Sequence, residues 1–342
     1  MNLAALLCSV ALAGGPQVEG DRLMQTLREL PITRAAMGAK EDIEGLAHTE
    51  EFVIKRLEDL GYKPATEDIE WAMPVRSWAG KDHVPRKWRN VIAEKTGTKV
   101  PEEVIVVSAH LDTVVGTPGA DDDGTGVAAL LELARVLRDE PLARTVRLAF
   151  FNLEEVGLAG SRQHVTARAG AKERVLGMMS LEMLGYFTDE PGSQRTPIPE
   201  IPGVFKPSTV GDFISIVGIK AHQAFSARLE AEMLKAAPGL KTARVDFLPI
   251  PAPDLLRSDH APFLAAGLPA VMITDTANFR NPNYHKPGDT VETIDAQRFT
   301  LVVQALAGAV RAIAEPALDG AASAGEGERA GEGKPAQKPA EK

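Results

Sequence analysis

The stretch VIVVSAHLDTVVGTPGADDDGTGVAALLELARVL, residues 104–137, places an apolar run, a polar loop and a second apolar run in succession. Residues 104–111 are rich in β-branched side chains and predict a buried strand. Residues 124–137 place apolar side chains at helical spacing and predict a helix. A buried strand that leads into an amphipathic helix is typical of α/β proteins.

The same alternation continues on both sides of this stretch. Apolar runs predict further strands at 146–151, 175–184, 213–219 and 270–276, and helical periodicity predicts helices at 49–60 and 298–313. Strands that alternate with helices form a mainly parallel sheet covered on both faces. We therefore expect an α/β fold of three layers, α/β/α, with a central mixed and mainly parallel sheet.

Composition divides the 342 residues into three parts. Residues 18–315 carry the strand and helix patterns and are expected to form a single domain. Residues 316–342 are rich in Ala, Gly, Glu, Lys and Pro and lack aromatic residues, so we expect a disordered tail. Residues 1–13 combine a short apolar run with an Ala-Leu-Ala sequence and are a candidate signal peptide. A cleaved leader implies export to the periplasm or beyond, and otherwise the protein would be cytoplasmic.

Charge and cysteine content exclude several classes of protein. The net charge is −9 and no basic stripe is present, which argues against nucleic-acid binding. Cys8 is the single cysteine, so a disulfide framework and a cysteine-based zinc site are both excluded. No apolar run is long enough to span a bilayer, and we expect no stable membrane insertion.

Polar residues gather where the predicted strands end. They are His110, Asp112, Asp121, Asp122, Asp123, Glu154, Glu155 and Glu182, with His285 later in the chain. Each has an ordinary explanation alone, since an aspartate before a helix is a common cap. Ligands bind beyond the carboxyl ends of parallel strands, so these groups should converge. Converging carboxylates need countercharge, and a mixed set of imidazoles and carboxylates suits zinc, or cobalt or manganese.

Six motifs carry a resemblance to a known family. In order they are HLD (110–112), GADDDGTG (119–126), NLEEVGLAGS (152–161), LEMLGY (181–186), SDHAPF (258–263) and NYHKPGDT (283–290). Together they resemble the di-zinc aminopeptidase family, metallopeptidase family 28, over residues 40–313. The resemblance implies the zinc-exopeptidase fold, two zinc ions per chain and a peptide substrate. It is compatible with a monomer or a small homo-oligomer.

The resemblance also assigns roles to individual residues. It makes His110, Asp122, Glu155, Glu182 and His285 the metal ligands. One metal would take His110, Asp122 and Glu182, and the other Glu155, His285 and Asp122, so Asp122 would bridge them.

Two residues of the motifs are implied to be catalytic rather than ligands. Glu154 matches the general base, which would act on a metal-activated water, and Asp112 matches the carboxylate that holds the ligand His110. The most frequent activity in the family is release of N-terminal residues, so we expect an aminopeptidase.

Several alternatives stay open at this stage. A dinuclear dipeptidase or carboxypeptidase-type amidohydrolase shares two of the motifs, and a carboxypeptidase would need a basic group, for which Arg257 and Arg280 are candidates. A glutaminyl cyclase or a binding protein of the same fold are further alternatives. Asp259 and His260 either line the site or form a self-satisfied turn. The Pro-rich segment 187–209 is either a functional rim or a surface insertion.

Overall fold

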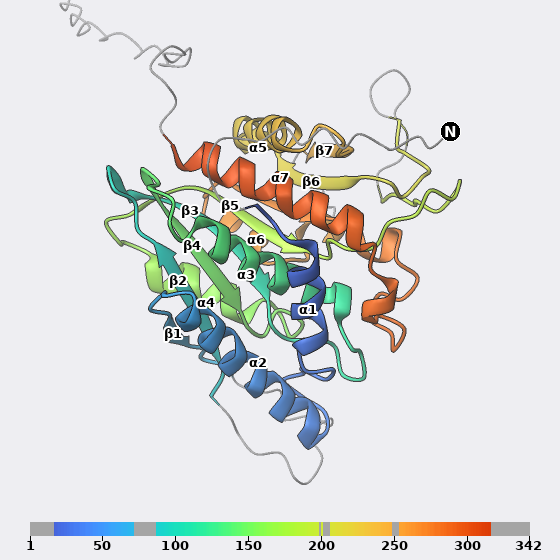
Figure 1. The fold of residues 1–342 in the computed structure, drawn as a ribbon, viewed down its shortest axis with the longest axis horizontal. Coiled ribbons are helices and arrows are strands. Elements are labelled where there is room, and N and C mark those ends of the chain that lie inside the picture. Colours follow the sequence, from blue (N-terminus) through green and yellow to red (C-terminus); the bar gives the residue numbers. More distant parts are fainter. Residues whose placement is uncertain (1–16, 72–86, 198–199, 201–205, 248–252, 316–342) are drawn as a thin grey trace, which may run out of the picture.

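One mixed sheet organises the chain (Figure 1). The computed structural model describes residues 17–71, 87–197, 200, 206–247 and 253–315. The candidate leader and the candidate tail lie outside these residues. The eight strands follow the order β1-β2-β4-β3-β5-β8-β6-β7, with bounds β1 Ala65–Asp68, β2 Arg89–Lys95, β3 Val100–His110, β4 Arg144–Phe151, β5 Arg174–Glu182, β6 Ile214–Ile219, β7 Thr242–Phe247 and β8 Ala270–Thr274.

Parallel pairing dominates the centre of the sheet. The pairs β3–β4, β3–β5, β5–β8 and β6–β7 are parallel, whereas β1–β2, β2–β4 and β6–β8 are antiparallel. The predicted mixed, mainly parallel sheet is confirmed. Since β4, β3, β5 and β8 are neighbours that run the same way, their carboxyl ends meet along one edge.

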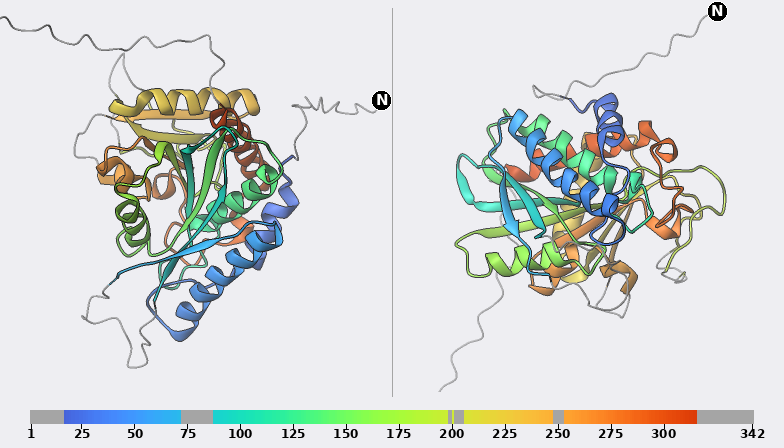
Figure 2. Two further views of the ribbon diagram at one scale, coloured as in Figure 1. Left: turned by 90° about the vertical axis from the view of Figure 1, so that its left-hand side faces the viewer. Right: turned by 90° about the horizontal axis from the view of Figure 1, so that it is seen from below.

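Helices cover both faces of this sheet (Figure 2). On one face α1, α3 and α7 contact one another, α2 packs on α3 and β2, and α5 packs on α7. On the other face α4 and α6 contact each other and the sheet. The helices are α1 Gly20–Glu29, α2 Lys40–Asp59, α3 Gly126–Leu137, α4 Ala159–Arg168, α5 Gln223–Ala236, α6 His260–Ala265 and α7 Ala296–Ala314. In the part of the chain that the structure describes, no helix is both long and apolar enough to cross a membrane.

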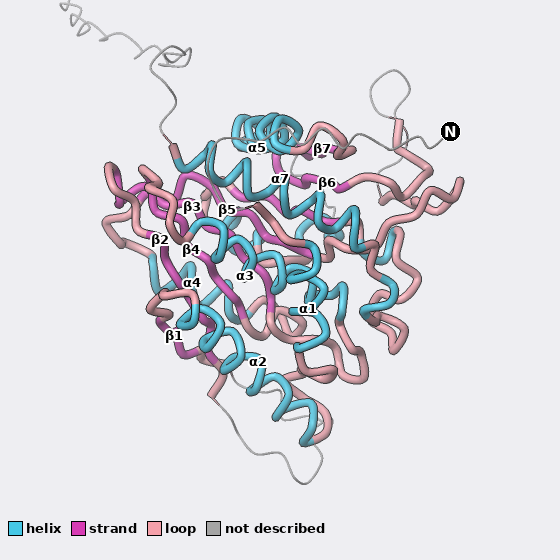
Figure 3. The backbone as a smooth tube through the Cα atoms, viewed as in Figure 1, coloured by secondary structure: helices cyan, strands magenta, loops and turns pink. Residues whose placement is uncertain are grey.

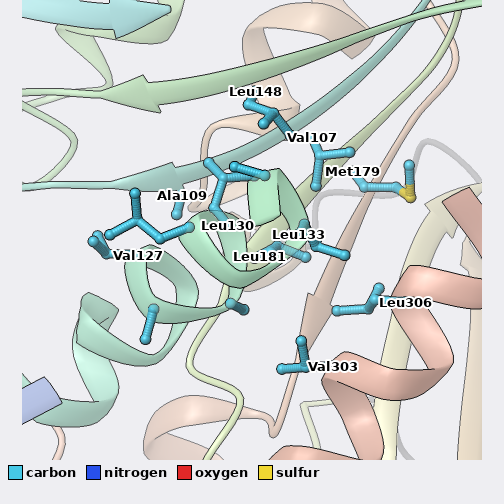
Figure 4. Packing of buried hydrophobic residues seen from close by; sticks show 14 of the residues in the cluster. Val107, Ala109, Val127, Leu130, Leu133, Leu148, Met179, Leu181, Val303 and Leu306 are labelled. Carbon is cyan, nitrogen blue, oxygen red and sulfur yellow. The ribbon is translucent and has the colours of Figure 1, made fainter. Parts of the chain in front are cut away.

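The core lies between β3, β4 and β5 and the helices α3 and α7 (Figure 4). Val107, Leu148 and Leu181 point from the sheet toward Leu130 of α3, and Leu306 of α7 completes the cluster. All five side chains are fully buried. Burial of a leucine or valine contributes about 1.5 to 3 kcal/mol, so these contacts stabilise the packing of α3 and α7 on the sheet.

The observed elements differ from the predicted ones in the start of one helix and in several short elements that were not predicted. The seven strands and helices predicted from residue 104 onward are found within a few residues of their expected bounds, whereas α2 begins nine residues earlier than expected, at Lys40. The elements not predicted, such as β1, β7 and α4, are short or half-exposed and lack a continuous apolar face. Figure 3 shows the helices, strands and loops of the described residues in separate colours.

Candidate metal centre

Four loops and strand ends bring the candidate residues together. His110 is the last residue of β3, Glu182 is the last of β5, and Glu154 and Glu155 follow β4. The loop after β8 supplies His285. The shared parallel direction of β4, β3 and β5 is the reason that residues far apart in sequence meet at this edge.

Asp122 lies between the two histidines. Its Oδ1 is 3.2 Å from Nε2 of His110, and its Oδ2 is 3.1 Å from Nε2 of His285. Nε2 of His285 is also 3.3 Å from Oε2 of Glu155, and Nε2 of His110 is 3.9 Å from Oε2 of Glu182. Each oxygen of one carboxylate therefore faces a different imidazole.

Three groups of these side chains could hold a metal ion: two of them include Asp122, and the third is His110, Glu154 and Glu155. The ligand atoms of His110, Asp122 and Glu182 lie within 4.8 Å of one another, and so do those of Asp122, Glu155 and His285. Nε2 of His110, Oε1 of Glu155 and Oε2 of Glu182 are buried and make no hydrogen bond within the described residues. Buried polar atoms normally have a partner. The mixed nitrogen and oxygen donors are those of zinc sites, so the residues fit the metal that the motifs implied.

The tautomer of His110 follows from its neighbour. Nδ1 of His110 lies 2.9 Å from the main-chain oxygen of Asp112. A carbonyl oxygen only accepts, so Nδ1 carries the hydrogen and Nε2 presents its lone pair to the cluster.

The carboxylate of Asp112 lies beside His110 and contacts the loop after β4. Its nearest oxygen is 3.7 Å from Nδ1 of His110, and its two oxygens instead accept hydrogen bonds from the main-chain N–H groups of Glu154, at 2.9 Å, and Glu155, at 3.2 Å. In this structure the carbonyl of Asp112 is the group within hydrogen-bonding distance of His110, and the carboxylate fixes the loop after β4.

The other two aspartates of the triplet are structural. Asp123 accepts hydrogen bonds from the main-chain N–H groups of His110, Gly126 and Met183, and so joins β3, α3 and the end of β5. Asp121 accepts from Gly185 N–H and from the side chain of Asn281. All three aspartates are buried, so neither neighbour of Asp122 faces water.

Asp289 supports the triplet from the opposite side. Its two carboxylate oxygens accept the main-chain N–H groups of Asp121 and Asp122 at 2.9 and 3.1 Å. Asp289 lies four residues after His285 in the same loop. The structure shows that it fixes the backbone of the candidate bridging residue.

Comparison with known proteins now adds to this geometry. The sequence profile of Peptidase family M28 matches residues 90–310. The chain belongs to this family. Over 297 residues it is 31% identical to the uncharacterized protein YfbL of Escherichia coli, covering 83% of this chain and 85% of that one. It is 30% identical to the probable lipoprotein aminopeptidase LpqL of Mycobacterium tuberculosis over 61% of this chain and 42% of that one.

Solved structures share the fold of this M28 chain. The zinc aminopeptidase BSAP of Bacillus subtilis superimposes with a TM-score of 0.65 at 15% identity, covering 90% of this chain and 98% of that one. The M28 family is zinc-dependent, and membership makes this chain a metallopeptidase of the hydrolase class.

Electrostatics of this M28 centre favour a bound cation. Burial opposes the charge on Asp122, but His110 and His285 outweigh it and lower the pKa of Asp122. Burial and the charge of Asp122 raise the pKa of Glu155 to about 7. Burial works against a charged His285, yet Asp122 and Glu155 raise the pKa of His285 to about 10. In the metal-free protein, protons on Glu155 and His285 take the place of cations.

Left-handed backbone adjoins the candidate ligands. Leu153 precedes Glu154 with φ 61°, Met183 follows Glu182 with φ 53°, and His285 itself has φ 56°. Residues other than glycine rarely adopt this conformation, and each such residue costs on the order of 1 kcal/mol or more. The surrounding contacts therefore hold these side chains in place at the expense of local backbone preference.

A cavity of about 830 Å³ opens onto the centre. Glu154, Glu182 and His285 line its inner end, and residues of β6, β7 and β8 line its side. The segments 194–197 and 206–208 also line it, so the described part of the Pro-rich segment forms a rim rather than a remote insertion. The volume is in the range of small-ligand pockets.

The SDHAPF segment has one structural residue and one residue near the centre. Nε2 of His260 lies 2.9 Å from the main-chain oxygen of Leu255, and burial lowers the pKa of His260 to about 4, so it is a neutral structural histidine. Asp259 is buried, and burial, with the charges of Glu182 and Asp112, raises its pKa to about 7.

Arg280 is excluded as a substrate-binding cation, whereas Arg257 lines the cavity. Arg280 is 6% exposed, donates to Gln194 and lies over the ring of Phe213. Arg257 lies over Tyr284, which in turn stacks on His285.

Proposed function

We propose that this protein is an aminopeptidase that binds two zinc ions. The observation that carries the proposal is Asp122, whose two oxygens face the two histidines at 3.2 and 3.1 Å. One ion would be held by His110, Asp122 and Glu182, and the other by Asp122, Glu155 and His285. Cobalt or manganese would be functional substitutes, because the same donor set accepts them.

Glu154 is proposed to move the proton. Zinc held between these side chains supplies Lewis acidity toward water and toward the scissile carbonyl. Burial raises the pKa of Glu154 well above its usual value, which suits a group that both takes and gives a proton. Glu154 accepts a proton from the attacking water while the oxygen of that water bonds to the carbonyl carbon. It then delivers that proton to the leaving nitrogen as the carbon–nitrogen bond breaks.

Asp112 keeps Glu154 in position for this step. The carboxylate of Asp112 accepts hydrogen bonds from the main-chain N–H groups of Glu154 and Glu155. These bonds fix two neighbouring residues, one proposed as the base and the other as a metal ligand. The carbonyl of Asp112 at the same time orients His110. One residue thereby couples the loop of the base to the first histidine.

Cleavage from the amino end is supported by relatives rather than by a specific contact. LpqL is named a probable aminopeptidase and shares 30% identity. A dipeptidase or carboxypeptidase would instead recognise a substrate carboxylate, for which Arg257 at the cavity wall is the candidate cation. A glutaminyl cyclase is the third candidate and would bind one zinc ion.

A peptide panel with measured metal content separates these candidates. We expect mass spectrometry to show loss of the first residue from free peptides, no cleavage of N-acetylated peptides, and full inhibition by a chelator that zinc reverses. Near two zinc ions per chain is expected. Loss of C-terminal residues from the acetylated peptides would establish the carboxypeptidase alternative, and cyclisation of N-terminal glutamine with one zinc would establish the cyclase.

Export is proposed on the candidate signal peptide at residues 1–13. The naming of LpqL as a lipoprotein is compatible with this. Amino-terminal sequencing of the protein from fractionated native cells should give a chain that begins near residue 14. An intact amino terminus in the cytoplasmic fraction would contradict export.

A further inference from the structure

A buried arginine outside the family match lies next to the metal centre. Arg34 precedes residues 90–310 in sequence and belongs to the segment between α1 and α2. Arg34 is 2% exposed and contacts no carboxylate among the described residues, a combination that is rare for an arginine. No motif of the sequence pointed to it.

The guanidinium of Arg34 binds main-chain oxygens at both ends of one loop. Nε donates to Leu111 O at 3.2 Å, Nη1 donates to Pro118 O at 2.9 Å, and Nη2 donates to Gly119 O at 2.8 Å. A fourth bond runs from Nη1 to Pro31 O at 3.0 Å. All the hydrogen bonds of this side chain within the described residues therefore go to carbonyl oxygens.

The main chain of Arg34 adds a fourth contact to the loop. Thr113 N–H donates to Arg34 O at 2.8 Å. The loop 111–119 begins directly after His110 and ends three residues before Asp122. Arg34 thus holds the connection between the first histidine and the candidate bridging carboxylate.

Close packing makes the loop sensitive to this contact. Gly119 has φ 64°, and a β-carbon added there would lie 2.2 Å from Thr113 Cγ2 and 2.5 Å from Asp122 O. The middle of the loop has no such support, since Val115 is 48% exposed. The ends are fixed while the middle faces solvent.

We propose that Arg34 is a positioning residue that staples the two ends of loop 111–119 and thereby sets the separation of His110 and Asp122 for metal binding. This inference rests on the proposed metal function of those two residues. Arginine suits the task because its planar fork reaches several acceptors at once, which a lysine ammonium does not. Its charge also lies near the aspartates of the centre without contacting them.

Cobalt binding to the full-length metal-free protein tests the proposal. We expect Arg34→Lys and Arg34→Gln each to weaken Co²⁺ affinity by about 10- to 100-fold in chelator competition, as for residues that orient ligands. The visible spectrum of bound Co²⁺ should also change. The matched control is Arg147→Gln, which removes an equally buried arginine from β4 and should leave both readouts unchanged.

Three results would overturn the staple. The first is wild-type affinity and spectrum in both Arg34 variants. The second is wild-type Co²⁺ affinity and spectrum in Arg34→Lys alone. A positive charge without the planar guanidinium would then be sufficient. The third applies if neither variant folds. Hydrogen exchange of the metal-free wild type should then show a protected Thr113 amide. Rapid exchange there would refute the hydrogen bond from Thr113 N–H to Arg34 O.

None of these readouts depends on peptide hydrolysis. A protein that binds Co²⁺ through Arg34-dependent geometry but cleaves no peptide would refute the proposed activity alone. A protein that cleaves peptides with Co²⁺ affinity independent of Arg34 would refute the staple alone.

Discussion

Two clusters of buried charges, one around Arg147 and one at the carboxyl ends of the strands, balance their charges differently. On β4, the side chain of Arg147 is 2% exposed, and its Nη2 lies 2.7 Å from a carboxylate oxygen of Glu94 and 2.7 Å from one of Glu173. At the carboxyl ends of the strands, carboxylates instead surround two imidazoles and one arginine that contacts only carbonyls. The carboxylates there are Asp112, Asp121, Asp122, Asp123, Glu154, Glu155, Glu182, Asp259 and Asp289.

The cluster around Arg147 has a structural role, whereas the cluster at the strand ends is suited to binding cations. Arg147 forms hydrogen-bonded ion pairs with Glu94 and Glu173, so this cluster needs no ligand to balance its charges. The strand-end cluster leaves buried polar atoms of His110, Glu155 and Glu182 without a hydrogen bond among the described residues. A set of buried carboxylates is stable only with added positive charge, and protons or metal ions supply it.

The largest effect is expected from Asp122→Ala, which removes the carboxylate shared by both groups. We expect zinc content to fall to background and activity to disappear, measured by atomic absorption and by peptide release. The control is Asp121→Asn, which keeps one acceptor oxygen and should retain zinc with a stability loss of about 1 to 3 kcal/mol. Full zinc content in Asp122→Ala would show that the two groups do not share a bridging residue.

Glu154→Gln should have the next largest effect. The amide cannot accept a proton, so we expect kcat to fall by about 10²- to 10⁴-fold with zinc content unchanged. Glu173→Gln is the matched control in the cluster around Arg147 and should lower stability without lowering kcat, since Glu173 forms ion pairs with Arg147 and Arg168 and lies outside the metal centre. Wild-type turnover in Glu154→Gln would remove Glu154 from the mechanism.

Metal affinity should depend on pH in a defined direction. Burial and nearby charges raise the pKa of Glu155 to about 7, and that of His285 is raised to about 10, so metal must displace protons from both. Affinity should therefore rise about tenfold per pH unit per displaced proton, more steeply below pH 7 than between 7 and 10. Zinc calorimetry in two buffers at several pH values measures the proton release, and an affinity that does not change with pH would contradict the assignment.

The same shifts predict the stability of the metal-free protein. Folded-state pKa values above the unfolded values mean that the native protein holds more protons, so its stability falls as pH rises. For Glu155 the loss runs from about pH 4.5 to 7, and for His285 from about 6.5 to 10. Melting temperatures with and without zinc should therefore diverge as the pH rises.

Arg147→Gln should have the smallest effect on activity. Breaking this buried group leaves two carboxylates with fewer cations and should cost about 3 kcal/mol of stability, because Glu94 reaches solvent and relaxes in part. Zinc content and kcat should stay at wild-type values, as judged by urea unfolding and peptide kinetics. A loss of zinc would show that the two charged regions are coupled through the sheet.

The sequence predicted the candidate metal centre better than its support. His110, Glu155 and Glu182 follow apolar strands, and parallel strands bring their ends together, so local patterns were sufficient to place them. The burial of Asp123 was not predictable, because its three N–H partners come from three separate elements. Arg34 carries no motif at all, and only tertiary packing reveals its contacts.

The segment before residue 90 contacts the loops that carry the candidate metal ligands. The family profile begins at residue 90, yet Glu50 of α2 accepts the side-chain N–H of Asn152, two residues before Glu154, and Arg34 binds loop 111–119. A fragment trimmed to the matched region would keep every candidate ligand and lose both of these supports. Any attempt to shorten, fuse or recombine this protein with a relative should therefore place its junction before Arg34.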